Sequence, residues 1–186
     1  MIDFLLDIDL SLFKSLNGLG SPYLDQVMIL LSAKYIWVPM YLLLIFALYK
    51  KYGYHFWMPL TYILIVFALS DHITSGIMKP FFERLRPCND PTIVDIYLPK
   101  GCGRKYGFAS SHAANTMGLA ISYLMLFGKR NWTVALLTWA ILVSYSRVYL
   151  GVHFPGDVLA GMLVGSSLAI LGWLLLKRIA PVLLSK

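Results

Sequence analysis

The chain has 186 residues, of which 59% are hydrophobic, and it carries a formal net charge of +7. Soluble domains contain about 45 to 50% apolar residues, so this composition argues against a soluble protein, and the length allows a single domain over residues 1–186. The basic residues are spread over short motifs and segment ends, without a nucleic-acid-binding module, so we expect no nucleic acid partner.

Residues 1–20 are predicted to form an amphipathic helix that lies in the membrane interface. Their apolar side chains recur at helical spacing, whereas Asp3, Asp7 and Lys14 fall elsewhere on the helix. Acidic residues also stand where a cleavable signal peptide would carry basic ones, so we expect no such peptide. The apolar positions that define the helix are Phe4, Leu5, Ile8, Leu12 and Leu16.

Five apolar stretches follow, and each is long enough to cross about 30 Å of hydrocarbon as a helix. The fifth contains Gly161 and Gly165, whose spacing predicts close packing against another helix. We therefore expect an all-α fold, a polytopic membrane helical bundle with about five transmembrane helices and the N-terminal interfacial helix. The stretches cover roughly residues 26–49, 56–78, 110–128, 131–151 and 157–176.

The parity of five crossings determines which segments share a membrane face. The N-terminus, the 79–110 loop and the turn near residues 146–157 fall on one face, and two short turns with the C-terminal tail fall on the other. The opposite face carries Lys and Arg and no acidic residue, which is typical of a cytoplasmic face. We therefore expect the loop face to be external. The basic residues of the opposite face are Lys50, Lys51, Lys129, Arg130, Lys177, Arg178 and Lys186.

Residues suited to bind phosphate gather on the loop face. Lys79 and Arg86 follow the second stretch, and Arg147 lies near the end of the fourth. Phosphoryl transfer spreads negative charge over oxygens that arginine forks and a lysine ammonium can neutralise. Ser110 and Ser111 begin the third stretch, where backbone N–H groups and the helix dipole favour an anion. The alternative for these serines is a role as helix caps.

Two histidines on the same face supply the reacting groups. One imidazole can attack phosphorus while a second protonates the departing oxygen. Asp157 follows His153 by four positions at a helix start, where its carboxylate can accept the other ring N–H. We therefore expect His153 to be the nucleophile, Asp157 to orient it, and His112 to act as the general acid.

These motifs resemble those of the type 2 phosphatidic acid phosphatase family, within the acid phosphatase and vanadium haloperoxidase superfamily. The first family motif, Lys-x6-Arg-Pro, matches residues 79–87, and the third, Ser-Arg-x5-His-x3-Asp, matches residues 146–157. The middle motif is usually Pro-Ser-Gly-His, and residues 109–112 read Ala-Ser-Ser-His. The resemblance implies a metal-independent lipid phosphate phosphatase with a helical membrane architecture, a phosphohistidine intermediate and no cofactor.

The resemblance also implies a substrate in the lipid bilayer and a bacterial-type enzyme. We expect it in the inner (cytoplasmic) membrane, with its site on the periplasmic or exterior face that the distribution of Lys and Arg indicates. Polyprenyl diphosphate, phosphatidylglycerol phosphate, phosphatidic acid and a lipid A type phosphate all fit. Two alternatives stay open: transfer of a phosphoryl or headgroup unit to another lipid, and a non-enzymatic anionic-lipid-binding or transport protein. A binding protein would explain Arg86 and Arg147 but not the pair His153 and Asp157. The oligomeric state is open.

Other polar residues receive structural interpretations. Asp71, Ser75 and Lys79 share one helical face, which predicts a hydrogen-bond chain that supports Lys79. Cys88 and Cys102 lie in the loop on the expected external face, which predicts a disulfide. The remaining charged residues are interpreted as snorkelling, for Lys34, or as loop solvation and headgroup attraction, for Glu83, Arg84, Lys100, Arg104 and Lys105.

Overall fold

The computed structural model describes residues 2–181, so Lys186, which is expected at the basic end, lies outside the described part. Within that part the chain is helical, and one isolated β-bridge pairs Leu85 with Tyr106. The predicted all-α fold is therefore confirmed. The α-helices are α1 (Ile2–Asn17), α2 (Pro22–Ser32), α3 (Val38–Tyr52), α4 (Trp57–Asp71), α5 (Lys79–Phe82), α6 (Ser111–Phe127), α7 (Asn131–Tyr149) and α8 (Pro155–Ile179). The shorter helical segments are η1 (Tyr35–Trp37), η2 (Gly53–His55), the π-helical η3 (His72–Met78) and η4 (Pro87–Asn89).

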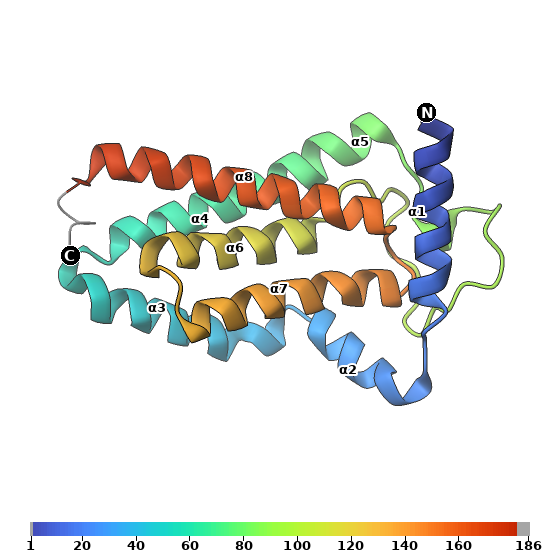
Figure 1. Ribbon diagram of the computed structural model, residues 1–186, viewed down its shortest axis with the longest axis horizontal. Coiled ribbons are helices and arrows are strands. Elements are labelled where there is room, and N and C mark those ends of the chain that lie inside the picture. The colour runs from blue at the N-terminus through green and yellow to red at the C-terminus, as the bar shows by residue number, and fades with distance from the viewer. Residues whose placement is uncertain (1, 182–186) are drawn as a thin grey trace.

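The helices form an elongated bundle with a functional end. Helices α3, α4, α6, α7 and α8 run along the long axis of the molecule, and α1 lies across one end of them (Figure 1). The loop between α5 and α6 and the turn between α7 and α8 lie at this same end. The fold thus gathers the loop segments that carry the predicted phosphate-binding residues beside α1.

The five apolar stretches are mostly helical, with a break at Ala33 and Lys34 in the first, and they differ in their capacity to cross a membrane. The continuous helix Trp57–Phe82 and α8 are long and apolar enough to do so. Pro22–Ser32 and Tyr35–His55 qualify only as a pair that is bent by 68°. Helix α6 has 17 residues, or about 26 Å at the usual rise, which is shorter than the hydrocarbon core. The described chain therefore has two spanning helices by this criterion, or three with the bent pair, and five crossings remain a prediction.

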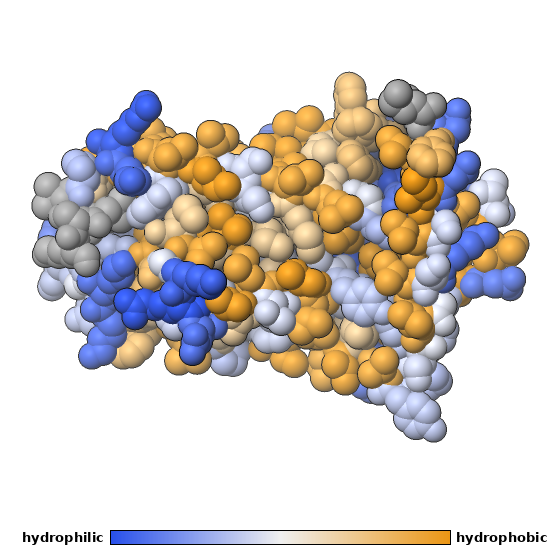
Figure 2. Space-filling model, in the orientation of Figure 1, coloured by the Kyte–Doolittle hydropathy of each residue, from blue (hydrophilic) through white to orange (hydrophobic). Residues whose placement is uncertain are grey.

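An apolar surface separates two hydrophilic ends of the bundle (Figure 2). The exposed fraction is more than half for each of four leucines, with values of 67%, 58%, 68% and 62% for Leu43, Leu64, Leu163 and Leu171. A contiguous apolar surface of this kind is unfavourable in water and is stable against lipid tails. The protein is therefore an integral membrane protein.

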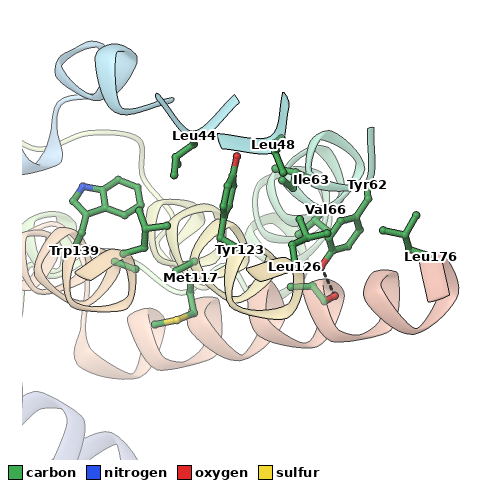
Figure 3. Close-up of a cluster of buried hydrophobic side chains, with 14 of the residues drawn as sticks. Leu44, Leu48, Tyr62, Ile63, Val66, Met117, Tyr123, Leu126, Trp139 and Leu176 are labelled. Atoms are coloured by element: carbon green, nitrogen blue, oxygen red, sulfur yellow. Dashed lines mark hydrogen bonds between the residues drawn. The ribbon is translucent and has the colours of Figure 1, made fainter. Parts of the chain in front are cut away.

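Aromatic residues fill the core between the long helices (Figure 3). Tyr62, Tyr123 and Trp139 are buried there. The Tyr62 hydroxyl donates to the carbonyl oxygen of Ala169 at 2.6 Å, so a polar group carried into the core is satisfied across α4 and α8.

Helix α8 packs closely on α6 through its two predicted packing glycines. A Cβ atom at Gly165 would lie 2.0 Å from the carbonyl oxygen of Ala114, and one at Gly161 would lie 2.3 Å from that of Ser110. Neither position has room for a side chain, which confirms the predicted close packing. The contact presses the start of α6 against the first half of α8.

Helix α1 has one face attached to the bundle and one face free. Phe13 and Asn17 are buried, and the Asn17 side-chain oxygen accepts the backbone N–H of Tyr97 at 2.8 Å. Phe4 and Leu5 on the free face are 66% and 59% exposed. An apolar free face suits a helix that rests in the membrane interface, which is the position predicted for it.

Candidate active site

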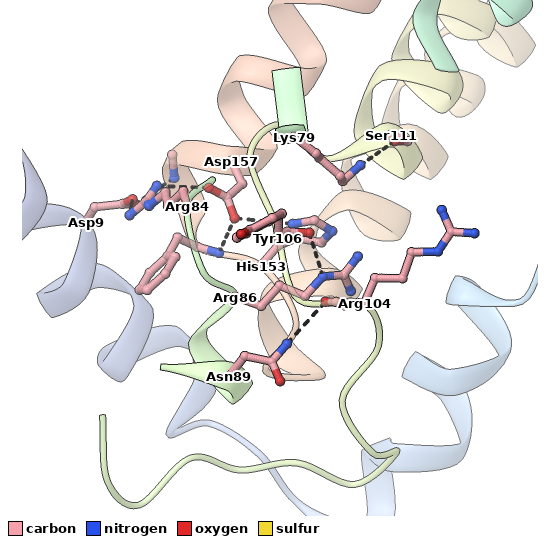
Figure 4. Close-up of polar contacts among 12 residues, drawn as sticks. Asp9, Lys79, Arg84, Arg86, Asn89, Arg104, Tyr106, Ser111, His153 and Asp157 are labelled. Atoms are coloured by element: carbon pink, nitrogen blue, oxygen red, sulfur yellow. Dashed lines mark hydrogen bonds and ion pairs between the residues drawn. The ribbon is translucent and has the colours of Figure 1, made fainter. Parts of the chain in front are cut away.

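The three predicted motif segments meet at the end of the bundle that α1 crosses (Figure 4). Lys79 begins α5, Arg86 lies in the loop that follows, and the turn between α7 and α8 supplies His153. Arg86, His112 and Arg147 line one cavity of about 670 Å³. No acidic residue occurs among the described residues that line it. The cavity is therefore suited to an anion.

His153 and Asp157 form a buried pair where the chain enters α8. Nδ1 of His153 lies 3.2 Å from Oδ2 of Asp157, and the same oxygen accepts the backbone N–H of Phe154 at 3.1 Å. Pro155 begins the helix, which places Asp157 in the first turn, where a carboxylate satisfies free N–H groups and faces the positive end of the helix dipole. The side chains of His153 and Asp157 are 2% and 0% exposed. The structure thus brings the predicted pair together.

The surroundings of His153 favour the neutral imidazole. Burial lowers the pKa of His153 well below its ordinary value of 6.5, and the positive charges of Arg147, Arg86 and Lys79 lower it further. Because a carboxylate only accepts hydrogen bonds, the neutral ring carries its proton on Nδ1 and donates it to Asp157. The Nε2 atom then holds a lone pair, which is the group that can attack phosphorus.

Lys79 is held at the site by a cluster of hydroxyl groups. Its Nζ atom donates to Oγ of Ser111 at 2.8 Å and to Oγ of Ser75 at 3.3 Å. Ser111 also contacts Ser75 at 2.7 Å and accepts the hydroxyl of Thr74 at 2.9 Å. The predicted support of Lys79 by Ser75 is therefore present. Thr74 is a member of this cluster that the sequence analysis missed.

The Asp71 side chain does not join this cluster, although its backbone oxygen accepts the Thr74 hydroxyl at 3.5 Å, so the predicted chain is wrong at its first member. No hydrogen bond links Asp71 to Ser75 in the part of the chain that the structure describes. The segment His72–Met78 is π-helical, and its wider turns break the four-residue alignment that a regular α-helix would give these two positions. Asp71 instead lines a second cavity, of about 140 Å³, together with Ser111 and His112.

Among the buried polar groups that have no hydrogen-bond partner in the described part of the chain, two belong to predicted site residues. They are the hydroxyl of Ser110, which precedes α6, and the Nε of Arg147, near the end of α7. Ser110 makes no side-chain cap bond to α6, and Nη1 of Arg147 contacts Oγ of Ser32. Buried polar groups are nearly always paired, so two that lack a partner need an explanation. A bound anion would supply the missing partner for both.

The loop after α5 positions Arg86. The Nε atom of Arg86 donates to the carbonyl oxygen of Tyr106 at 3.2 Å, which joins the two ends of the loop beside the cavity. The predicted disulfide between Cys88 and Cys102 is present, with 5.7 Å between the Cα atoms. The Cys88–Cys102 disulfide and the hydrogen bond to the Tyr106 carbonyl oxygen therefore both hold Arg86 in place.

The prediction that Arg84 serves loop solvation is wrong. Its Nη1 donates to Oδ1 of Asp157 at 2.9 Å, and its Nη2 donates to Oδ2 of Asp9 at 2.6 Å. Only 22% of the Arg84 side chain is exposed. Asp9 was missed as well. Its signal in the sequence is the four-residue spacing with Phe13 and Asn17, which puts one of the few acids on the inner face of α1.

The remaining charged residues that were predicted to serve snorkelling or loop solvation differ in their distance from the cavities. Lys34, at the break between α2 and α3, lines both the 670 Å³ and the 140 Å³ cavities. Lys100 lines the larger cavity, so it adds a positive charge there and does not only solvate the loop as predicted. Glu83, Arg104 and Lys105 are exposed, as expected of solvated loop residues.

Phosphoryl transfer is the chemistry that this end of the bundle supports. It needs cations around the phosphorus oxygens, and the oriented, neutral imidazole supplies a nucleophile beside them. The fold and the site therefore define a membrane-embedded enzyme of phosphoryl transfer.

Comparison with known proteins agrees with this class. The family model described as the PAP2 superfamily matches residues 56–180. A lipid A 4'-phosphatase of Bacteroides thetaiotaomicron is 39% identical over 171 residues, covering 89% of this chain and 75% of the relative. An undecaprenyl-diphosphatase of Sulfolobus acidocaldarius is 35% identical over 170 residues, covering 88% and 76%. The crystal structure of Aquifex aeolicus LpxE has a TM-score of 0.70 at 25% identity, covering 88% of this chain and 93% of that chain.

The chain belongs to the PAP2 superfamily. It is a hydrolase of phosphoric esters. The family expected from the three sequence motifs is therefore confirmed.

Proposed function

We propose that the protein removes a phosphate group from a membrane lipid through a phosphohistidine intermediate at His153. One observation carries this proposal: the buried, neutral His153 is paired with Asp157 beside a cationic cavity. A protein that only binds anionic lipids needs the cations but has no use for an oriented imidazole.

The reaction has two displacements. In the first, Nε2 of His153 attacks phosphorus, a P–N bond forms, and the P–O bond to the lipid breaks while His112 protonates the departing oxygen. In the second, His112 accepts a proton from water, whose oxygen attacks phosphorus as the P–N bond breaks. The products are the dephosphorylated lipid and inorganic phosphate, and His153 returns to its neutral form. Asp157 orients the ring and stabilises its positive charge in the intermediate.

Five residues are proposed to bind the phosphate oxygens. Arg86 and Arg147 offer planar forks, and Lys79 adds a compact charge that no arginine can supply. Ser110 offers a buried hydroxyl that has no hydrogen-bond partner among the described residues. Ser111 orients the Lys79 ammonium and stands at the start of α6, where backbone N–H groups favour an anion.

The cavities beyond His112 support a substrate with a hydrocarbon chain. His112 lines both the 670 Å³ and the 140 Å³ cavities. The smaller cavity shares Tyr41, Phe67 and Trp139 with a third, of about 280 Å³, whose other lining residues are mostly apolar. A lipid can therefore place its phosphate near His112 while its chain lies among apolar side chains.

We propose a phosphomonoester on a lipid A type glycolipid as the first substrate to test, because the lipid A 4'-phosphatase relative is similar over 89% of this chain. A polyprenyl diphosphate is the second, because the undecaprenyl-diphosphatase relative is similar over 88%. Phosphatidylglycerol phosphate and phosphatidic acid complete the panel.

We further propose that residues 1–186 form one membrane-embedded domain with five crossings and with α1 in the interface. The end with Lys50, Lys51, Lys129, Arg130, Lys177 and Arg178 carries the positive charge typical of a cytoplasmic face. The site would then face the periplasm or exterior of a bacterial inner membrane.

Phosphate release by the purified protein in micelles tests this function. Each lipid of the panel is offered to the protein and to His153→Ala, and kcat/KM is ranked. We expect the lipid A type phosphate to rank first and His153→Ala to release no phosphate. Equal release by both proteins would remove the proposal. Phosphate that appears on an added acceptor lipid instead of in solution would favour a transferase.

A further inference from the structure

The two oxygens of the Asp157 carboxylate have different partners (Figure 4). Oδ2 faces Nδ1 of His153 at 3.2 Å, and Oδ1 accepts Nη1–H of Arg84 at 2.9 Å. The carboxylate torsion has a broad energy well, so the direction of Oδ2 depends on the Phe154 N–H that it accepts at 3.1 Å and on what holds Oδ1. Arg84 is therefore the side chain that holds the second oxygen, while a backbone N–H holds the first.

Arg84 is held in turn by helix α1. Its Nη2 donates to Oδ2 of Asp9 at 2.6 Å, and Oδ1 of Asp9 accepts the backbone N–H of Gly156 at 2.7 Å. Gly156 belongs to the first turn of α8, where an anion also interacts favourably with the helix dipole. Asp9 thus links the arginine to the start of the helix that carries Asp157.

Aromatic contacts support the same arrangement. The guanidinium carbon of Arg84 lies 4.1 Å from the centroid of the Phe154 ring, a favourable position for a cation over an aromatic face. Phe154 follows His153 in the chain and packs edge-on against Phe13 of α1, with ring centroids 5.4 Å apart. Helix α1 therefore contacts the Arg84 fork directly through Asp9 and indirectly through Phe13.

We propose that Asp9 and Arg84 are positioning residues that hold the Asp157 carboxylate on His153, so that helix α1 takes part in catalysis. Burial disfavours the charged form of Asp157 and the positive charge of Arg84 opposes that effect, so Arg84 helps the carboxylate to stay negative and to stabilise the ring when it becomes positive. The two terminal nitrogens of the Arg84 guanidinium are engaged by Asp157 and Asp9, and neither Asp9 nor Arg84 is among the five residues proposed to bind phosphate, so we expect them to act on turnover and not on lipid binding. This inference rests on the proposed phosphohistidine mechanism.

The first test separates kcat from KM. Arg84→Gln should lower kcat by about 10²-fold and leave KM nearly unchanged, because a small misorientation of the reacting group has this cost. Asp9→Asn should lower kcat by about tenfold, since Arg84 would still contact Asp157 but lose its second anchor. Arg84→Lys should not restore kcat, because an ammonium cannot reproduce the fork between two carboxylates.

A double variant tests whether the two residues act in series. Asp9→Asn combined with Arg84→Gln should be no slower than Arg84→Gln alone, since Asp9 acts through the arginine. Asp7→Asn is the matched control, because Asp7 is an exposed acid on the same helix, and it should keep the kcat of the unmodified protein. A thermal melt of each variant verifies that it is folded.

The outcomes separate this inference from the proposed function. His153→Ala and the unmodified protein are measured alongside with the same lipid phosphate, and equal phosphate release by both would overturn the mechanism itself. If His153→Ala is inactive while folded Arg84→Gln keeps kcat within about twofold, only the positioning role is overturned. Strictly additive losses in the double variant, or an equal loss in Asp7→Asn, would also overturn it.

Discussion

The backbone N–H of Ser110 donates to the backbone carbonyl oxygen of Asp157 at 2.9 Å, which joins the start of α6 to the first turn of α8. The proposed phosphate-binding serine and the partner of the nucleophile are thus placed by a single helix contact. That contact rests on the absence of side chains at Gly161 and Gly165.

Gly165→Ala should loosen this contact. Its new Cβ would lie 2.0 Å from the Ala114 carbonyl oxygen, so α8 must move away from α6. We expect a loss of about 1 to 3 kcal/mol in the free energy of unfolding, with a lower melting temperature in micelles and a lower kcat. Leu163→Ala, at a site 68% exposed on the same helix, is the control and should melt near the unmodified protein. Equal melting of both variants would contradict the packing argument.

Asp157→Asn should slow turnover without unfolding the protein. An asparagine amide can present an N–H where the carboxylate accepts one, which favours the wrong tautomer of His153. A comparable change in serine proteases costs about 10⁴ in kcat, and we expect about 10² to 10⁴ here. KM should change little. Near-normal kcat in a variant shown by its thermal melt to be folded would mean that Asp157 only stabilises the start of α8.

His112→Ala should depend on the leaving group. A general acid matters most when the departing oxygen is basic, as in a lipid phosphate, and least for an activated aryl phosphate. The ratio of kcat/KM in the variant to that in the unmodified protein should therefore be higher for the aryl ester. Equal losses for the two substrates would assign His112 a role other than proton donation.

Acidification should reveal the unusual state of His153. Burial, reinforced by the charge of Arg147, holds the pKa of His153 well below 6.5 in the folded protein. The unfolded chain binds this proton near pH 6.5, so His153 lowers stability as the pH falls below that value and has no such effect above it. In NMR spectra of histidine-labelled protein, the signal that is missing from His153→Gln should not titrate near pH 6.5. A midpoint at that pH would show a solvated ring.

Activity should persist in excess EDTA. The negative charge of the transition state is neutralised in the proposed mechanism by Lys79, Arg86 and Arg147, and a divalent cation has no step to perform. The measurement is phosphate release after dialysis against the chelator. Activity that is lost and then restored by Mg²⁺ or Zn²⁺ would contradict the mechanism.

Local spacing in the sequence determined the helices, the packing glycines and the pairing of His153 with Asp157. Four residues separate His153 from Asp157, and at a helix start this distance brings the two side chains together, as the structure shows. The same kind of argument located the packing glycines and the apolar helices, because helical periodicity acts within a few residues. The parity of the apolar stretches placed the motif segments at one end.

The tertiary structure alone decided how the pair is held. Arg84 meets Asp157 across 73 residues of sequence and Asp9 across 75, and Asp9 meets Gly156 across 147. No periodicity encodes such contacts, because they depend on how the loop after α5 folds back and on where α1 crosses the bundle. The π-helical segment that separates the Asp71 side chain from the Lys79 cluster could not be predicted from the sequence either. Spacing along the chain predicts contacts only for a regular α-helix, and residues 72–78 depart from that geometry.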